Sequence, residues 1–78
     1  MTDKNNYLTK DICEATALIA TGQNMIKIEK TAGICWFTFE NEEKCKNLSD
    51  QYWFGQLSIE ARNYKDILDR LKNRIFSI

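Results

Sequence analysis

Side chains that commonly carry out chemistry are scarce in this sequence of 78 residues, which contains no histidine. A Ser-His-Asp or Cys-His nucleophile pair therefore cannot form within one chain, nor can a metal site that includes histidine. The three cysteines, Cys13, Cys35 and Cys45, are far apart and form no C-x-x-C pair. Because their number is odd in so short a chain, we expect free, buried cysteines in a reducing cytosol rather than a disulfide framework.

The carboxylates are poorly placed for catalysis. Glu42 and Glu43 are adjacent, so they diverge on a helix and do not form a shared acid–base pair or a metal site. Other acids lie four residues from a cation, as Asp69 does from Lys65. We therefore expect no catalytic, cofactor-binding or metal-binding residues, and we predict that the protein is not an enzyme and uses no cofactor.

An aromatic group is the feature that most favours binding. If Trp36 lies on an uncovered face of a hairpin, beside Ile34 and two lysines, it can anchor a protein partner, because interfaces favour Trp. The same face can instead stack an unpaired base, with the lysines on the phosphates. Cover of Trp36 by the N-terminal arm or by a second subunit is the structural alternative. The candidate partner-binding residues are Trp36, Ile34, Lys27, Lys30 and Phe54.

The charge balance argues against strong attraction to polyanions. Eleven basic and eleven acidic side chains give a formal net charge of zero, so a strong electrostatic drive onto DNA, RNA or an anionic membrane is not indicated. A small surplus of cations from Ala61 onward fits a solvated helix face, and a face that contacts phosphates is the alternative. The longest apolar run, 17–20, is too short to span a bilayer, and residues 1–7 have no apolar signal-peptide core. We expect a cytoplasmic protein that does not bind membranes.

The length and composition predict one small α+β domain over residues 1–78, with residues 1–6 as a flexible N-terminal arm. Hydrophobic periodicity and the three glycines divide the chain into elements in the order α-β-β-α-α. The predicted helices cover 9–21, 42–54 and 59–76, and the predicted strands cover 25–30 and 34–40. The strands form a two-stranded antiparallel hairpin, which is marginal alone and must pack on the helices.

Alternation along the hairpin defines two faces. Phe37 and Phe39 share one face, and Trp36 lies on the other. We expect the helices to cover the Phe37 face together with Ile26 and Ile28. The predicted helix N-caps are Thr9, Asn41 and Ser58.

The third predicted helix carries a narrow apolar seam whose members are three or four residues apart. They are Ala61, Tyr64, Leu68, Leu71 and Ile75. We expect this seam to face the core. A homodimer built on the same seam is the alternative. It is not the first expectation, because the seam is too short to define a coiled coil. Tyr52 and Trp53 in the second helix are also expected in the core.

The order of motifs resembles a known family. The opening segment reads Tyr-x-Thr-x-Asp-x-x-x-Ala over 7–15, the aromatic strand reads Trp-Phe-Thr-Phe-Glu over 36–40, and Tyr-Trp-x-Gly occupies 52–55. Over 7–75 the chain resembles a family of very small bacterial and bacteriophage proteins known only as a domain of unknown function. The resemblance implies a compact α+β fold and a phage or mobile-element setting, and it implies no activity.

We therefore predict a non-enzymatic interaction module, encoded by a phage or mobile element and acting in the cytoplasm of a bacterial host. It would bind another protein through the aromatic hairpin face and a helix surface. Weak, nonspecific binding of single-stranded nucleic acid and a structural homodimer are the alternatives.

Overall fold

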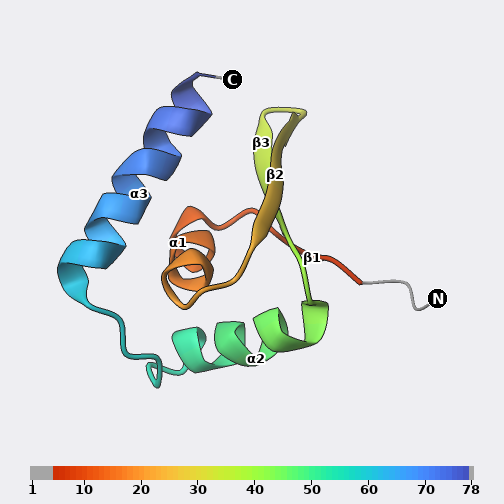
Figure 1. Cartoon of the computed structure of the whole chain (residues 1–78). Helices are drawn as coiled ribbons and strands as arrows, with labels where there is room; N and C mark the ends of the chain where they lie inside the picture. The colour runs from red at the N-terminus through yellow and green to blue at the C-terminus, as the bar shows by residue number, and fades with distance from the viewer. Residues whose placement is uncertain (1–4, 78) are drawn as a thin grey trace.

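The computed structural model describes residues 5–77 and has a three-stranded antiparallel sheet packed against three helices (Figure 1). The strands are β1 (Tyr7–Thr9), β2 (Met25–Thr31) and β3 (Ile34–Phe39), and the helices are α1 (Ile12–Ala20), α2 (Glu42–Trp53) and α3 (Ala61–Phe76). The predicted α+β class is confirmed. The predicted order is wrong because it lacks β1, and the hairpin is part of a three-stranded sheet with the order β1-β3-β2.

β1 precedes α1 and overlaps the predicted opening helix, 9–21, only at Thr9. Residues 7–9 pair antiparallel with residues 37–39, which makes β3 the central strand. The helix begins after Asp11, whose carboxylate accepts the N–H groups of Cys13 at 2.8 Å and Glu14 at 3.0 Å. Thr9 is therefore a strand residue and not the N-cap, because Asp11 lies two residues later and is the stronger cap.

Of the two other predicted N-caps, Asn41 is confirmed and Ser58 is not. Asn41 caps α2, and its side chain accepts the N–H of Lys44 at 3.2 Å. α3 begins two residues later than predicted, because Glu60 and not Ser58 is its N-cap. The Glu60 carboxylate accepts the N–H of Asn63 at 3.0 Å.

The start of the chain is attached to α2. Residues 1–4 of the predicted arm lie outside the described residues. The carbonyl of Asn5 accepts a hydrogen bond from the backbone N–H of Glu42 at 3.0 Å. This bond holds the chain beside α2 just before β1 begins.

The hairpin turns tightly and contains one bulge. Ala32 and Gly33 have positive φ values of 53° and 81°, as a two-residue type I′ turn requires. The register shifts by one residue between Met25 and Lys27, so Ile26 is the extra residue of a bulge. Met25 packs against the core, whereas Ile26 is 46% exposed. The prediction that the helices cover Ile26 is therefore wrong, because the bulge changes the alternation of faces.

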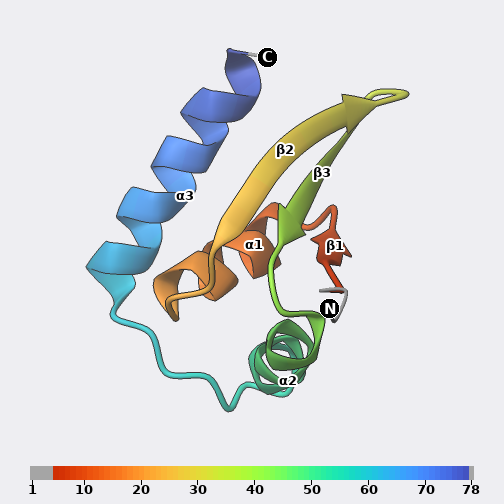
Figure 2. The same cartoon turned by 45° about the vertical axis from the view of Figure 1, so that its right-hand side comes forward.

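α1 lies at the centre of the molecule. Figure 2 shows the sheet on one side of α1, α3 on the other side and α2 across the lower end of the sheet. The fully buried core contains Ala15 and Leu18 of α1, Phe37 and Phe39 of β3, and Cys45 of α2. Burial of each phenylalanine side chain contributes about 1.5–3 kcal/mol to folding.

The predicted apolar seam of α3 packs toward α1 over most of its length. Leu71 is buried in the core cluster and Ile75 packs against it, as does Ile67 beside the seam. Tyr64 and Leu68 are half-buried, whereas Ala61 is exposed, so the prediction of a core position is wrong for Ala61, which lies in the first turn of the helix. The Tyr64 hydroxyl donates a hydrogen bond to the carbonyl of Cys13 at 3.2 Å, which connects α3 to α1. Among residues 5–77, no helix has the length and apolar character needed to cross a bilayer.

Candidate functional site

The sheet has one face that the helices leave uncovered. Because Phe37 and Phe39 point into the core, the alternate residues of β3 point the other way. Residues paired with them across the sheet share that side, since Leu8 and Lys27 lie opposite Thr38, and Glu29 lies opposite Trp36. We call this surface the open face, and its residues are Leu8, Lys27, Glu29, Ile34, Trp36 and Thr38. Figures 1 and 2 show α1 and α3 on the opposite side of the sheet.

The open face exposes apolar side chains at its two ends. Leu8 is 52% exposed and Ile34 is 40% exposed, while Trp36 between them is half-buried. Within residues 5–77 no helix crosses these side chains. Singly exposed apolar side chains are common on protein surfaces, so the open face is a candidate because Trp36 lies on the same face between the two.

Charge on the open face is balanced. The Lys27 ammonium lies 3.5 Å from a carboxylate oxygen of Glu29, and both side chains are more than half exposed. An ion pair at this exposure contributes little to stability. It does neutralise the lysine locally, so the open face presents no surplus of positive charge.

Thr38 occupies the middle of the open face but is buried. Leu8 and Lys27 flank it on the neighbouring strands. Its hydroxyl Oγ1 has no hydrogen-bond partner among the described residues. A buried hydroxyl without a partner lowers the free energy of unfolding by about 1–3 kcal/mol. Thr38 is therefore expected to destabilise the fold relative to an apolar side chain of the same shape.

The predicted binding residues do not all come together. Trp36, Ile34 and Lys27 share the open face, but Lys30 lies opposite Cys35 and therefore belongs to the other side of the hairpin. Phe54 is 77% exposed at the C-terminal end of α2, which both ribbon views place at the opposite end of the molecule from the hairpin turn.

The end of α2 is more exposed than its pattern predicts. The prediction of a core position for Trp53 is wrong, since this side chain is 60% exposed. Tyr52 is half-buried, and its ring meets Trp53 edge-to-face at a centroid distance of 5.2 Å. The buried residues of α2 are Cys45 and Ser49, so the last turn extends past the core.

A buried carboxylate network lies next to the sheet, and the sequence analysis did not identify it. Glu14 of α1 accepts hydrogen bonds from Thr9 Oγ1 at 2.6 Å and from the Tyr7 hydroxyl at 2.5 Å. The Ser49 hydroxyl of α2 also donates to Glu14. The network therefore joins β1, α1 and α2. Its only sequence signal is one acid inside an otherwise uncharged helix, ICEATALIA.

The tyrosine of this network is held in its neutral form. Burial and the hydrogen bond to Glu14 raise the pKa of Tyr7 from its ordinary value of 10.0 to about 12. The phenol consequently keeps its proton, and remains a hydrogen-bond donor, above pH 10. Burial also raises the pKa of the Cys45 thiol, which suits a packing role rather than a nucleophilic one.

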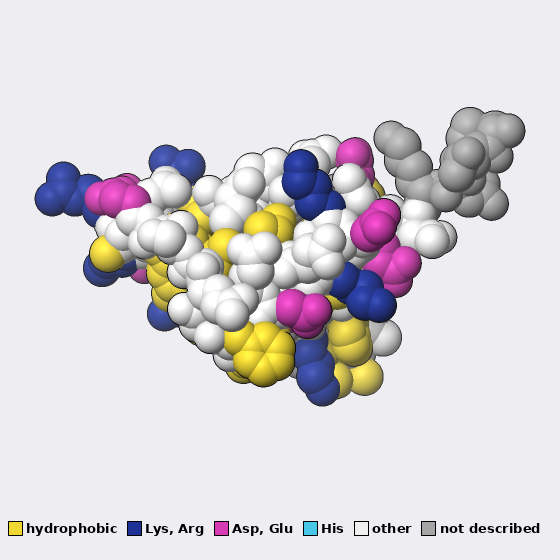
Figure 3. Space-filling model, turned by 90° about the horizontal axis from the view of Figure 1, so that it is seen from below, with side chains coloured by type: hydrophobic (Ala, Val, Ile, Leu, Met, Phe, Trp, Pro, Cys, Tyr) yellow, Lys and Arg dark blue, Asp and Glu magenta, His cyan; other side chains and the backbone are white. Residues whose placement is uncertain are grey.

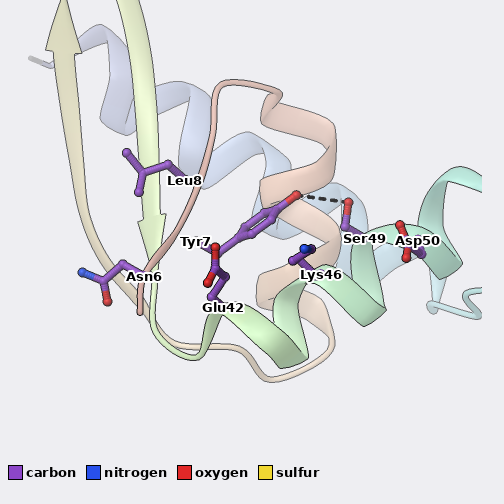
Figure 4. A pocket seen from close by; sticks show the side chains of 7 residues that line it. All are labelled: Asn6, Tyr7, Leu8, Glu42, Lys46, Ser49 and Asp50. Carbon is purple, nitrogen blue, oxygen red and sulfur yellow. Dashed lines mark hydrogen bonds between the residues drawn. The ribbon is translucent and has the colours of Figure 1, made fainter. Parts of the chain in front are cut away.

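A surface pocket of about 450 Å³ borders the network. Figure 4 shows the ring of Tyr7 in its wall, with the hydroxyl 3.2 Å from Ser49 Oγ. The remaining lining residues are Asn6, Leu8, Glu42, Lys46 and Asp50. Leu8 thus belongs both to the pocket and to the open face.

The end of the molecule seen from below carries charges of both signs. Figure 3 shows positive and negative side chains interspersed there, with hydrophobic side chains between them. A surface of this kind has no extended positive area that would attract a polyanion. Within residues 5–77, His, Cys, Asp and Glu side chains form no group of three or more that could hold a metal ion.

Comparison with known proteins relates nearly the whole chain to one family. The family described as "Domain of unknown function (DUF5659)" matches residues 4–77. The chain belongs to this family. The resemblance found in the sequence is thereby confirmed at the level of the family. No curated protein and no solved structure matches the chain.

Membership in the DUF5659 family assigns no chemistry to any residue. The functional reading of the chain therefore depends on its own surfaces. Of these, the open face presents exposed apolar side chains on a regular sheet, whereas Trp53 and Phe54 occupy the end of a helix and the loop after it.

Proposed function

We propose that this protein is a non-enzymatic interaction module that binds another protein through the open face of its sheet. The observation that supports the proposal is the exposure of Leu8 and Ile34 on a sheet face that no helix covers within residues 5–77. Trp36 lies between them, and tryptophan is a frequent source of binding energy in protein interfaces.

The chemistry of the open face defines the kind of partner. Its two charges, Lys27 and Glu29, neutralise each other, so a partner needs an apolar centre and no large charge of either sign. Single-stranded nucleic acid is the weaker alternative. Lys30 belongs to the opposite side of the hairpin, which leaves Lys27 as the one lysine among the open-face residues.

The proposal includes a setting for the protein. We infer that it is encoded by a phage or mobile element and acts in the cytoplasm of a bacterial host. This part is supported by the family resemblance rather than by geometry. Sequencing of the neighbouring genes tests it, and flanking genes unrelated to phages or mobile elements would contradict it.

The binding proposal is tested by comparing two exposed apolar positions. Ile34→Glu introduces a charge on the open face, and Phe76→Glu introduces the same charge at an 87% exposed position at the end of α3. Proteins captured from host lysate by the wild-type chain are purified, and their affinities are measured by calorimetry. We expect Ile34→Glu to weaken binding at least about tenfold, because a charge among the apolar side chains of the interface is desolvated, and Phe76→Glu to leave binding unchanged.

Equal effects of the two substitutions, or none, would show that the open face is not the binding surface. A labelled single-stranded oligonucleotide provides the second arm. Binding that is strong at low salt and falls steeply toward physiological salt would favour the nucleic-acid alternative over the proposal.

A further inference from the structure

β2 is an edge strand with an unpaired outer side. In the sheet order β1-β3-β2, it pairs with β3 alone among the described residues. Lys27, Glu29 and Lys30 on this strand are exposed. The edge is seven residues long, whereas the opposite edge, β1, has three. A free strand edge of this length presents a row of backbone donors and acceptors.

The turn geometry determines which backbone groups point outward. In the type I′ turn the carbonyl of Thr31 faces the N–H of Ile34, so these residues form a hydrogen-bonded pair. Hydrogen-bonded and non-hydrogen-bonded pairs alternate along an antiparallel ladder. The backbone groups of Glu29 and Lys27 therefore point toward β3, and those of Ile28 and Lys30 point away from it.

The charges of β2 are self-complementary about Ile28. If a second β2 strand pairs antiparallel with Ile28 opposite Ile28, each Lys27 lies opposite a Glu29 of the other copy. This register also places two outward-pointing Ile28 backbones together, as a hydrogen-bonded pair requires. Unlike charges directly opposite each other stabilise a strand pair.

The neighbouring registers lack this match. Centring the pair on Lys27, Glu29 or Lys30 places that residue opposite its own copy, with like charges facing each other. A parallel, in-register pairing does the same at every charged position. Within this segment, only the Ile28-centred register both pairs outward-pointing backbone groups and places unlike charges opposite each other.

We infer that two copies of this chain associate through their β2 edges, antiparallel and centred on Ile28, to form a continuous six-stranded sheet. The contact is isologous, so it closes as a two-fold dimer. The two Ile28 side chains meet on the side that packs on α1, and the Lys27–Glu29 pairs lie on the open face. The dimer thereby joins two open faces into one surface. The inference does not depend on the proposed function.

The bulge limits the extent of the contact. Ile26 interrupts the regular ladder at the start of β2, so regular pairing covers residues 27–31. Bulges and edge lysines protect strand edges against uncontrolled pairing. Here they leave a short edge that accepts one register, which favours a closed dimer over an open fibre.

Charge substitutions at two exposed positions test the inference. The wild-type chain is expected to change from monomer to dimer between about 10 µM and about 1 mM in sedimentation equilibrium. Lys27→Glu and Glu29→Lys alone each place like charges opposite each other and should weaken the dimer at least about tenfold. The double variant Lys27→Glu/Glu29→Lys restores the match and should dimerise like the wild type. An equimolar mixture of the two single variants should form a heterodimer.

A backbone measurement gives an independent readout. The amide of Ile28 should exchange with solvent slowly when the chain is dimeric and rapidly at low concentration, while the circular dichroism of all variants stays unchanged. A wild-type monomer at the highest concentration, or a dimer unaffected by the single substitutions, would overturn the inference. Partner binding is measured separately through Ile34→Glu, so a failure of the dimer leaves the proposed function standing.

Discussion

The Tyr7 hydroxyl donates a hydrogen bond to Glu14 at 2.5 Å, across the junction between β1 and α1. The carboxylate receives two further hydroxyl bonds, from Thr9 and from Ser49 of α2. A buried carboxylate is costly unless such donors surround it. One acidic residue thus links three elements through hydrogen bonds.

Removal of the Glu14 carboxylate should destabilise the whole domain. Glu14→Ala leaves the hydroxyls of Tyr7, Thr9 and Ser49 without their acceptor, and we expect a loss of about 3 kcal/mol or more in the free energy of unfolding. Urea denaturation measures this loss. Glu60→Ala, which removes an exposed cap, is the control, with an expected cost of about 1 kcal/mol. Equal costs would contradict a central role for the network.

Stability at high pH should depend on Tyr7. Its pKa is raised to about 12 in the folded protein from an ordinary value of 10.0, so the folded state holds the proton more tightly than the unfolded state. This contribution is complete below pH 10 and is lost as the pH rises from 10 to about 12. Tyr7→Phe should therefore lose less stability over that range than the wild type.

Thermal unfolding at several pH values measures the difference. Burial also raises the pKa values of Tyr52 and Tyr64, so the variant retains some alkaline sensitivity. Parallel loss of stability by the variant and the wild type from pH 10 to 12 would show that Tyr7 makes no contribution.

Replacement of Thr38 by valine should stabilise the protein. The substitution keeps the shape of the side chain and removes a buried hydroxyl that has no partner among residues 5–77. We expect a gain of about 1 kcal/mol in the free energy of unfolding, measured in urea. Thr16→Val is the matched control, because the Thr16 hydroxyl donates to the Ile12 carbonyl at 2.7 Å and its removal should bring no gain. A loss of stability in Thr38→Val would indicate that its hydroxyl has a partner in solution.

Two neighbouring aromatic residues should respond differently to alanine. Phe37 is buried in the core, and its replacement should cost about 3–5 kcal/mol. Trp36 lies on the open face and is half-buried, so we expect Trp36→Ala to cost about 1–2 kcal/mol. Denaturant midpoints compare the two variants directly. A greater cost for Trp36→Ala would mean that the open face is a packed surface.

Local patterns in the sequence predicted much of this fold. Alternation over 34–39 and the Gly33 turn predicted the hairpin, and Asn41 followed by two acids predicted the start of α2. The apolar seam of α3 predicted its packing face, although not its first residue. Each of these signals involves residues close together in the sequence, so it can be recognised without knowledge of any distant segment.

Other features depended on contacts between distant segments. β1 is a strand because three residues near the N-terminus pair with residues 37–39, and no three-residue pattern predicts such a partner. The bulge removes Ile26 from the core face and brings Met25 to it, and Trp53 is exposed because α2 extends past the core. Glu14 is buried because hydroxyls from β1 and α2 converge on it. The sequence by itself determined the helices and the hairpin through local periodicity and capping, whereas only the tertiary structure decided the third strand, the carboxylate network and the face that stays open, because each requires residues that meet only after the chain has folded.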